Sequence, residues 1–144
     1  MWQKFSFYDV RVIGHYLGVL ISFFSLLLVV PLVTALVLQE WEPATRYLLA
    51  IGLSLIVGAG MRMMRIQPGR LNRQQAMAVT GLAWFFLALI AAVPLALSDH
   101  YASYIDALFE CMSGLTTTGA SILKDVETLS HGILFWRSFT HWIG

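Results

Sequence analysis

The sequence predicts an all-α integral membrane protein. Two leading transmembrane helices are followed by a third helix, a re-entrant half-helix with its loop, and the start of a further transmembrane helix. Of the 144 residues, 58% are hydrophobic and only 12% are charged, which lies outside the range of ordinary soluble domains. Long apolar runs are followed by a shorter apolar segment that threonines, serine and glycine interrupt. Composition and this pattern together predict the class.

Three runs are long enough to span a membrane, because a helix rising ~1.5 Å per residue needs about 20 residues to cross ~30 Å of hydrocarbon. The first lies within residues 12–38, which carry no formal charge and form too long a run for a cleaved signal peptide. The second covers residues 47–64 and the third residues 76–98. The glycines of the second run predict close helix packing; they are Gly52, Gly58 and Gly60.

The chain divides near Pro68-Gly69, a dipeptide typical of a break between elements. We expect residues 1–68 to form a two-helix transmembrane hairpin and residues 69–144 to form a helix, loop and helix unit that is truncated in its second helix. Cytoplasmic loops accumulate Lys and Arg, so the loop between the second and third spans and the N-terminus are predicted to be cytoplasmic. The basic residues concerned are Lys4, Arg11, Arg62, Arg65, Arg70 and Arg73.

A short helix is predicted after the third span. Ser103 followed by Asp106 fits a helix-starting capping box, and apolar residues then recur at helical spacing. Gly114 is predicted to end the helix, because glycine most easily takes the left-handed conformation just past a helix end. About ten residues rise ~15 Å, which is half a bilayer.

The chain then returns through the TTTGAS segment (residues 116–121). Non-helical backbone at membrane depth is tolerated only where protein buries it or where it lines a water-filled cavity. In such a cavity, backbone carbonyls and threonine hydroxyls can replace the hydration shell of a monovalent cation, and the half-helix directs its negative end at the same place. The segment therefore predicts a cation site.

These residues carry a resemblance. "ALFECMSGLTTTGAS" at residues 107–121, followed by "LFWRSFTHWIG" at residues 134–144, resembles the first pore loop and the next helix of the Trk/Ktr/HKT superfamily of potassium transporters, closest to its TrkH branch. In that family four non-identical helix, pore loop, helix repeats surround one potassium-selective filter. TrkH-type members carry two additional helices first, which matches the predicted hairpin.

The resemblance implies filter residues Thr116, Thr117, Thr118 and Gly119, with the carbonyls of the last three as preferred K⁺ ligands. It implies potassium uptake across the bacterial inner membrane by passive or ion-coupled (symport) conduction. It also implies a homodimer and a cytoplasmic nucleotide-binding regulatory subunit of the TrkA type. One repeat supplies one of four filter walls. Either this chain is the N-terminal part of a longer transporter that contains the remaining pore repeats, which we expect, or copies and other chains complete the pore.

Three charged residues flank the segment in sequence. Asp106 and Glu110 are candidates for concentrating cations electrostatically. The alternatives are helix capping for Asp106, which we favour, and an internal hydrogen bond or ion pair for Glu110. Arg137 is expected either to pair with an acid such as Glu110 or to reach the outer interface.

Other functions have weaker support. A non-conducting membrane scaffold or assembly subunit is the main alternative, with the polar loop binding partner helices. No Ser/His pair, HExxH motif or metal-ligand spacing predicts an enzyme or an organic cofactor. The net charge of +1 gives no indication of a nucleic-acid partner, so membrane lipid and other chains of the transporter are the expected partners.

Overall fold

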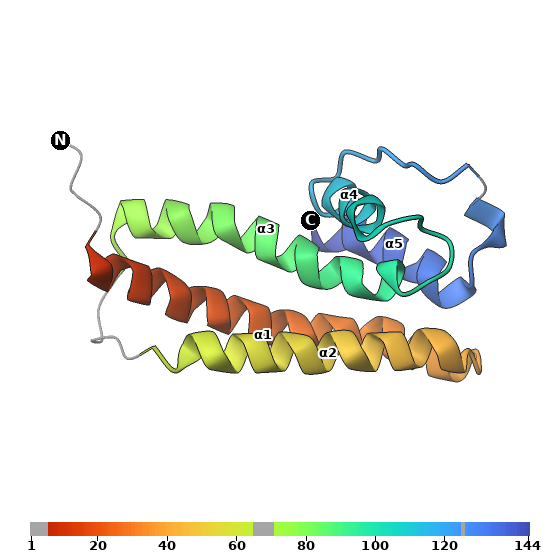
Figure 1. The fold of residues 1–144 in the computed structure, drawn as a ribbon, viewed down its shortest axis with the longest axis horizontal. Helices are drawn as coiled ribbons and strands as arrows, with labels where there is room; N and C mark the ends of the chain where they lie inside the picture. The colour runs from red at the N-terminus through yellow and green to blue at the C-terminus, as the bar shows by residue number, and fades with distance from the viewer. Residues whose placement is uncertain (1–5, 65–70, 125) are drawn as a thin grey trace.

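A computed structural model describes residues 6–64, 71–124 and 126–144 (Figure 1). The elements in this part are α1 (Phe7–Val37), α2 (Trp41–Arg62), α3 (Arg73–Ala96), α4 (Tyr104–Leu115), the short 3-10 helix η1 (Val126–Thr128) and α5 (His131–Ile143). The described residues contain no strand. Helices α1, α2 and α3 are long and apolar enough to cross a membrane. The all-α membrane class is therefore confirmed.

The three long helices begin earlier than the apolar runs alone predict. Helix α1 begins at Phe7 because the Asp9 carboxylate accepts a hydrogen bond from the backbone N–H of Ser6 at 2.7 Å. Helix α3 begins in the same way, with Asn72 N donating to Gln75 Oε1 at 2.8 Å. In both helices a polar side chain ahead of the apolar run accepts a hydrogen bond from the N–H of the N-cap residue and so fixes the start of the helix.

Helices α1 and α2 form an antiparallel hairpin, and α3 lies along α1 on the other side (Figure 1). The hairpin is closest at two glycines, where a Cβ added to Gly58 would lie 2.9 Å from the carbonyl oxygen of Gly18. A Cβ added to Gly52 or Gly60 would meet nothing within 4 Å. The prediction of close packing therefore holds for Gly58 and fails for the other two glycines.

The start of α1, the end of α2 and the start of α3 meet at one end of the bundle (Figure 1). Gln75 Nε2 donates to Asp9 Oδ1 at 2.7 Å, and His15 Nδ1 lies 3.0 Å from the carbonyl oxygen of Arg62. Three of the basic residues that predict the cytoplasmic side lie at this end, namely Arg11, Arg62 and Arg73. Some of its residues and the predicted break lie outside the described residues: Lys4, Arg65, Pro68, Gly69 and Arg70.

The core of the opposite half is built around Trp136 of α5, which is fully buried. Its indole packs edge-on against Phe24 of α1 and Tyr47 of α2, each with ring centroids 6.1 Å away. Its Nε1–H donates to the carbonyl oxygen of Ala91 in α3 at 3.0 Å. One side chain thereby joins α5 to all three long helices.

Helices α4 and α5 extend along only part of the bundle (Figure 1). Their last residues, Leu115 and Ile143, line an apolar cavity of about 240 Å³ together with Leu20 and Trp84. Leu20 and Trp84 belong to the middle of α1 and α3. Both short helices therefore end near the middle of the long ones.

Candidate functional site

Helix α4 starts where the sequence predicts and ends later. Ser103 Oγ accepts a hydrogen bond from the backbone N–H of Asp106 at 3.3 Å, which confirms the predicted cap. The prediction that Gly114 ends the helix is wrong, because the helix continues to Leu115 and Gly114 is buried inside it. A Cβ added at Gly114 would collide with Oγ1 of Thr140 in α5. This glycine serves the close approach of α4 and α5, not the helix end.

The helix ends in a hydrogen-bonded reversal with a threonine at its left-handed position. Thr117 has a φ of +55°. Its N–H donates to the carbonyl of Gly114 at 2.8 Å, and the N–H of Thr118 donates to that of Ser113 at 2.9 Å. This pair of bonds is the Schellman motif, in which glycine usually takes the place of Thr117. The N–H of Gly119 adds a bond to Ser113 O at 3.4 Å.

Gly119 is the second left-handed residue of the segment, with a φ of +77°. A Cβ added there would meet no atom within 4 Å. Glycine is therefore required at this position by the backbone conformation, which residues with side chains rarely adopt. Steric crowding around a side chain is not the cause.

The amides and the carbonyls of the TTTGAS segment have opposite environments. The amides of residues 116–119 donate back to carbonyls of α4. In the part of the chain that the structure describes, no hydrogen bond is accepted by the carbonyls of residues 116–120. All residues of the segment are exposed. At residues 116–119 the reversal thus presents free carbonyl acceptors while its own N–H groups are already bonded, which is an arrangement suited to a cation.

The threonine hydroxyls are partly engaged locally. Thr116 Oγ1 donates to the carbonyl of Met112 at 2.7 Å and lies 2.9 Å from Thr118 Oγ1. Among the described residues, no group of three or more His, Cys, Asp or Glu side chains is placed to hold a metal ion. The candidate ligands of this region are therefore backbone carbonyls.

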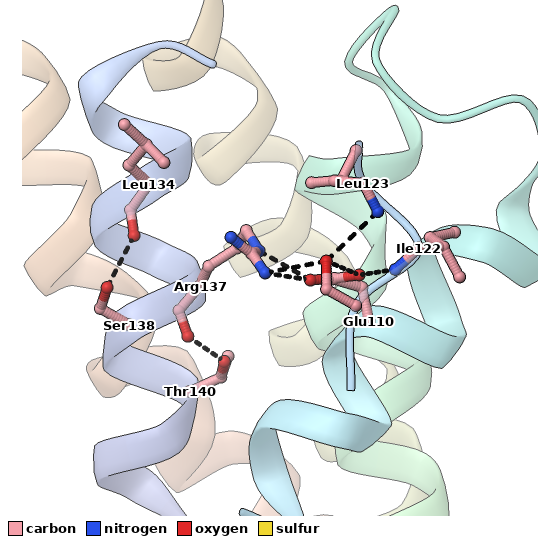
Figure 2. A network of polar contacts seen from close by, with 8 residues as sticks. Glu110, Ile122, Leu123, Leu134, Arg137, Ser138 and Thr140 are labelled. Carbon is pink, nitrogen blue, oxygen red and sulfur yellow. Dashed lines mark hydrogen bonds and ion pairs between the residues drawn. The ribbon is translucent and has the colours of Figure 1, made fainter. Parts of the chain in front are cut away.

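An ion pair between Arg137 and Glu110 lies beside the chain that follows the TTTGAS segment (Figure 2). Arg137 of α5 contacts Glu110 of α4 through both Nε, at 2.8 Å, and Nη2. The second carboxylate oxygen of Glu110 accepts hydrogen bonds from Ser121 Oγ at 3.2 Å and from the N–H of Ile122 at 3.3 Å. Arg137 Nη2 also donates to Ser121 Oγ at 3.2 Å. Two roles were expected for Arg137, and the structure shows the first of them, pairing with Glu110.

The predicted site residues fall into two groups. The four candidate filter residues share one reversal, and Glu110 is joined to the segment through Ser121. Asp106 lies in the first turn of α4, about 15 Å along the helix from Thr116 at ~1.5 Å per residue. It does not belong to the cluster around Glu110.

Ser121 is not among the site residues predicted from the sequence, yet it contacts both members of the ion pair. The sequence holds a signal for the ion pair, since Glu110 and Arg137 are opposite charges in apolar segments, but none for Ser121, which ends a polar run. Buried polar groups need partners, so such residues are expected to find one another.

Fold and site together define a helical membrane protein in which a half-length helix delivers a carbonyl-rich reversal to the middle of a bundle. Residues 43–144 match the TrkH family of cation transport proteins. This chain belongs to that family. The family consists of cation transport proteins and not of enzymes, which agrees with the expectation from the sequence.

Individual proteins that are similar to this chain also have names of cation transport proteins. The chain is 36% identical over 136 residues to an uncharacterized cation transporter of Methanocaldococcus jannaschii, covering 94% of this chain and 28% of that protein. It is 32% identical over 137 residues to the Trk system potassium uptake protein TrkG of Escherichia coli K12, with the same coverage of 94% and 28%. These curated relatives are thus matched over 28% of their length.

A solved structure is also similar. The crystal structure of the potassium transporter TrkH from Vibrio parahaemolyticus superposes with a TM-score of 0.85 at 28% sequence identity. The match covers 93% of this chain and 29% of that one. The fold described above is therefore that of one part of a TrkH protein.

Proposed function

We propose that this chain forms the leading hairpin and the first pore repeat of a potassium uptake protein, in which the TTTGAS segment is one of four walls of a carbonyl-lined filter. One observation carries the proposal. At residues 116–119 the N–H groups donate to carbonyls of α4, whereas the carbonyls accept no hydrogen bond from the described residues. The name of the Escherichia coli relative, a potassium uptake protein of the Trk system, supports K⁺ as the transported ion.

The chemistry is replacement of hydration. A K⁺ ion that enters the filter exchanges its water for oxygens of Thr116, Thr117, Thr118 and Gly119, mainly their carbonyls. The carboxyl-terminal end of α4 points at the same place and contributes a partial negative charge from its aligned peptide dipoles. No covalent step and no organic cofactor are involved.

Glu110 and Asp106 have different parts in this proposal. The Arg137 guanidinium neutralises the Glu110 carboxylate, so its main contribution is to fix Ser121 and Ile122, and thus the end of the segment. Asp106 is partly exposed in the first turn of α4, where its carboxylate suits the positive end of the helix, in keeping with the capping role favoured from the sequence.

The remaining arrangement follows the family resemblance. We place residues 1–68 as the hairpin and residues 69–144 as the first repeat, re-entrant at α4, in a multi-pass protein of the bacterial inner membrane. The end that carries Arg62 and Arg73 faces the cytoplasm, as the N-terminus does. The full transporter is a homodimer with the remaining repeats and a regulatory subunit of the TrkA type.

Exchange of Gly119 tests the filter assignment. In the full-length protein, Gly119→Ser is expected to lower the ratio of K⁺ to Na⁺ uptake, because serine resists the left-handed conformation at φ +77° and displaces the neighbouring carbonyls. Gly81→Ser is the matched control, since a Cβ there also meets nothing within 4 Å and Gly81 lies in α3. Unchanged selectivity of Gly119→Ser would contradict the proposal.

Cysteine accessibility separates the filter from a scaffold, which family membership does not favour. Single cysteines at Thr117 and Gly119 of the full-length protein are expected to react with small water-soluble thiol reagents and to be protected by K⁺ more than by Na⁺. Cysteines whose reactivity is the same in both salts would support a loop that only binds partner helices.

A further inference from the structure

The start of α5 is capped by a residue of the leading hairpin. The side chain of Ser130, the residue before α5, makes no capping hydrogen bond. Instead Glu40 accepts hydrogen bonds from the N–H of His131 at 3.0 Å and from the N–H of Gly132 at 2.8 Å, one on each carboxylate oxygen. The first N–H groups of a helix have no partner within it, and a carboxylate suits its positive end. The cap comes from 91 residues earlier in the chain.

The packing around this cap leaves little freedom. A Cβ added to Gly132 would lie 2.9 Å from Glu40 Oε2 and 3.4 Å from the Cβ of Ala35. On the other side, the hydroxyl of Tyr47 donates to the carbonyl oxygen of Gly132 at 2.9 Å, and this bond is buried. The end of α1, the connection after it and α2 together fix the first turn of α5.

The same helix carries Arg137, which holds the filter segment. Arg137 follows Gly132 by five positions, about 7.5 Å along the axis at ~1.5 Å per residue. Its guanidinium contacts both Glu110 and Ser121. Since a helix transmits displacement as a rigid element, a shift at Gly132 moves the group that positions Ser121.

We infer that Glu40 is a positioning residue for the selectivity filter, acting from the leading hairpin through α5, Arg137 and Glu110 on the end of the TTTGAS segment. The inference rests on the proposed function, in which this segment lines a K⁺ filter. It gives the hairpin, which lies outside the pore repeat, a defined part in ion selection.

Glu40→Gln in the full-length protein tests the role of the carboxylate. An amide retains one acceptor and places an NH₂ group against a backbone N–H, so one bond to the start of α5 is lost. We expect the ratio of K⁺ to Na⁺ uptake to fall by about two- to thirtyfold, the range typical of mutations that act on one site through packed elements. The apparent KM for K⁺ should rise at unchanged protein amount. Glu42→Gln is the matched control, because that side chain is exposed and, within the described part of the chain, pairs with Arg46 alone.

A second pair of variants keeps the Glu40 carboxylate and changes the residue that donates to it. His131 is the first residue of α5, where proline is well tolerated, and Ser130 before it is already extended at φ −60° and ψ 150°. His131→Pro abolishes the N–H that donates to Glu40. His131→Ala keeps that N–H and removes the exposed imidazole, whose Nδ1 lies 3.4 Å from Glu40 Oε1, a surface contact that is worth little. We expect His131→Pro to reduce selectivity as Glu40→Gln does, and His131→Ala to resemble the unmodified protein.

The outcomes separate this inference from the proposed function. If the unmodified full-length protein transports no K⁺, the proposed function fails. If it transports K⁺ selectively and both Glu40→Gln and His131→Pro keep its selectivity and KM, Glu40 does not position the filter. If Glu40→Gln does not accumulate in the membrane, the His131→Pro and His131→Ala pair decides alone.

Discussion

Arg137 and Glu110, 27 residues apart in the chain, form a buried ion pair between α5 and α4, and both of them hydrogen-bond Ser121. The side chain of Glu110 is 4% exposed and that of Arg137 18%. Removing two charges from water is costly, and the additional bonds to Ser121 and Ile122 offset part of that cost. The pair is therefore a fixed attachment point for the segment that follows α4.

Single substitutions in this pair should destabilise more than the double one. Glu110→Gln or Arg137→Gln leaves the other charge buried without its partner, which costs about 3–5 kcal/mol, whereas the double variant leaves no charge. Thermal unfolding of the full-length protein in detergent measures the effect. Glu42→Gln breaks an exposed pair and should cost at most about 1 kcal/mol. A double variant as unstable as the sum of the single ones would contradict the prediction.

Thr117→Gly should stabilise the end of α4. A left-handed conformation costs a residue with a side chain roughly 1–2 kcal/mol, and glycine adopts it freely. We expect slower hydrogen exchange of the amides of residues 117 and 118, which close the reversal. Thr118→Gly is the control, since Thr118 is not among the residues with positive φ and glycine there only adds freedom. Equal effects of the two changes would show that φ at Thr117 is not the cause.

Gly58→Ala should loosen the leading hairpin. Its Cβ would lie 2.9 Å from the carbonyl oxygen of Gly18 and 3.0 Å from the backbone nitrogen of Ser22, so the helices must separate. Such overpacking typically costs about 1–3 kcal/mol and should lower the unfolding temperature. Gly60→Ala, in the same helix but facing open space, should leave it nearly unchanged. A Gly58→Ala protein as stable as Gly60→Ala would refute the close contact.

Gly114→Ala should separate α4 from α5, because the new Cβ collides with Oγ1 of Thr140. We expect a lower unfolding temperature and a lower K⁺ uptake rate in the full-length protein. Thr140→Ala in the same chain removes that oxygen and should restore part of both. Gly81→Ala, which meets nothing within 4 Å, is the matched control. No rescue by Thr140→Ala would indicate that another contact is responsible.

The long helices were predictable because an uncharged run of about 20 residues has few alternatives to spanning a membrane. Their starts were not, because charged residues at the membrane surface can still be helical. Helix α2 begins at Trp41 and contains Glu42 and Arg46, with Pro43 in the first turn, where its missing N–H is not needed. The apolar run alone therefore placed its beginning too late.

The site was predictable in composition and only partly in geometry. A glycine near the end of an apolar helix favours a helix stop, yet Gly114 serves contact with Thr140 and Thr117 takes the left-handed position. The Glu110–Arg137 pair could be anticipated because two opposite charges lie in apolar segments. The bonds from Glu40 to His131 and Gly132 could not, because contacts across 91 residues leave no periodic signal in the sequence.

The position of α5 in the chain has a consequence for biogenesis. Three contacts described above involve residues of α5. His131 donates a hydrogen bond to Glu40, Arg137 pairs with Glu110, and Thr140 packs against Gly114. Synthesis proceeds from the N-terminus, so each of the two carboxylates leaves the ribosome before its partner on α5. The hairpin can close as soon as α2 is made, whereas α4 reaches its final packing only after α5 has followed. Among the described helices, α5 is thus the one whose arrival completes these contacts.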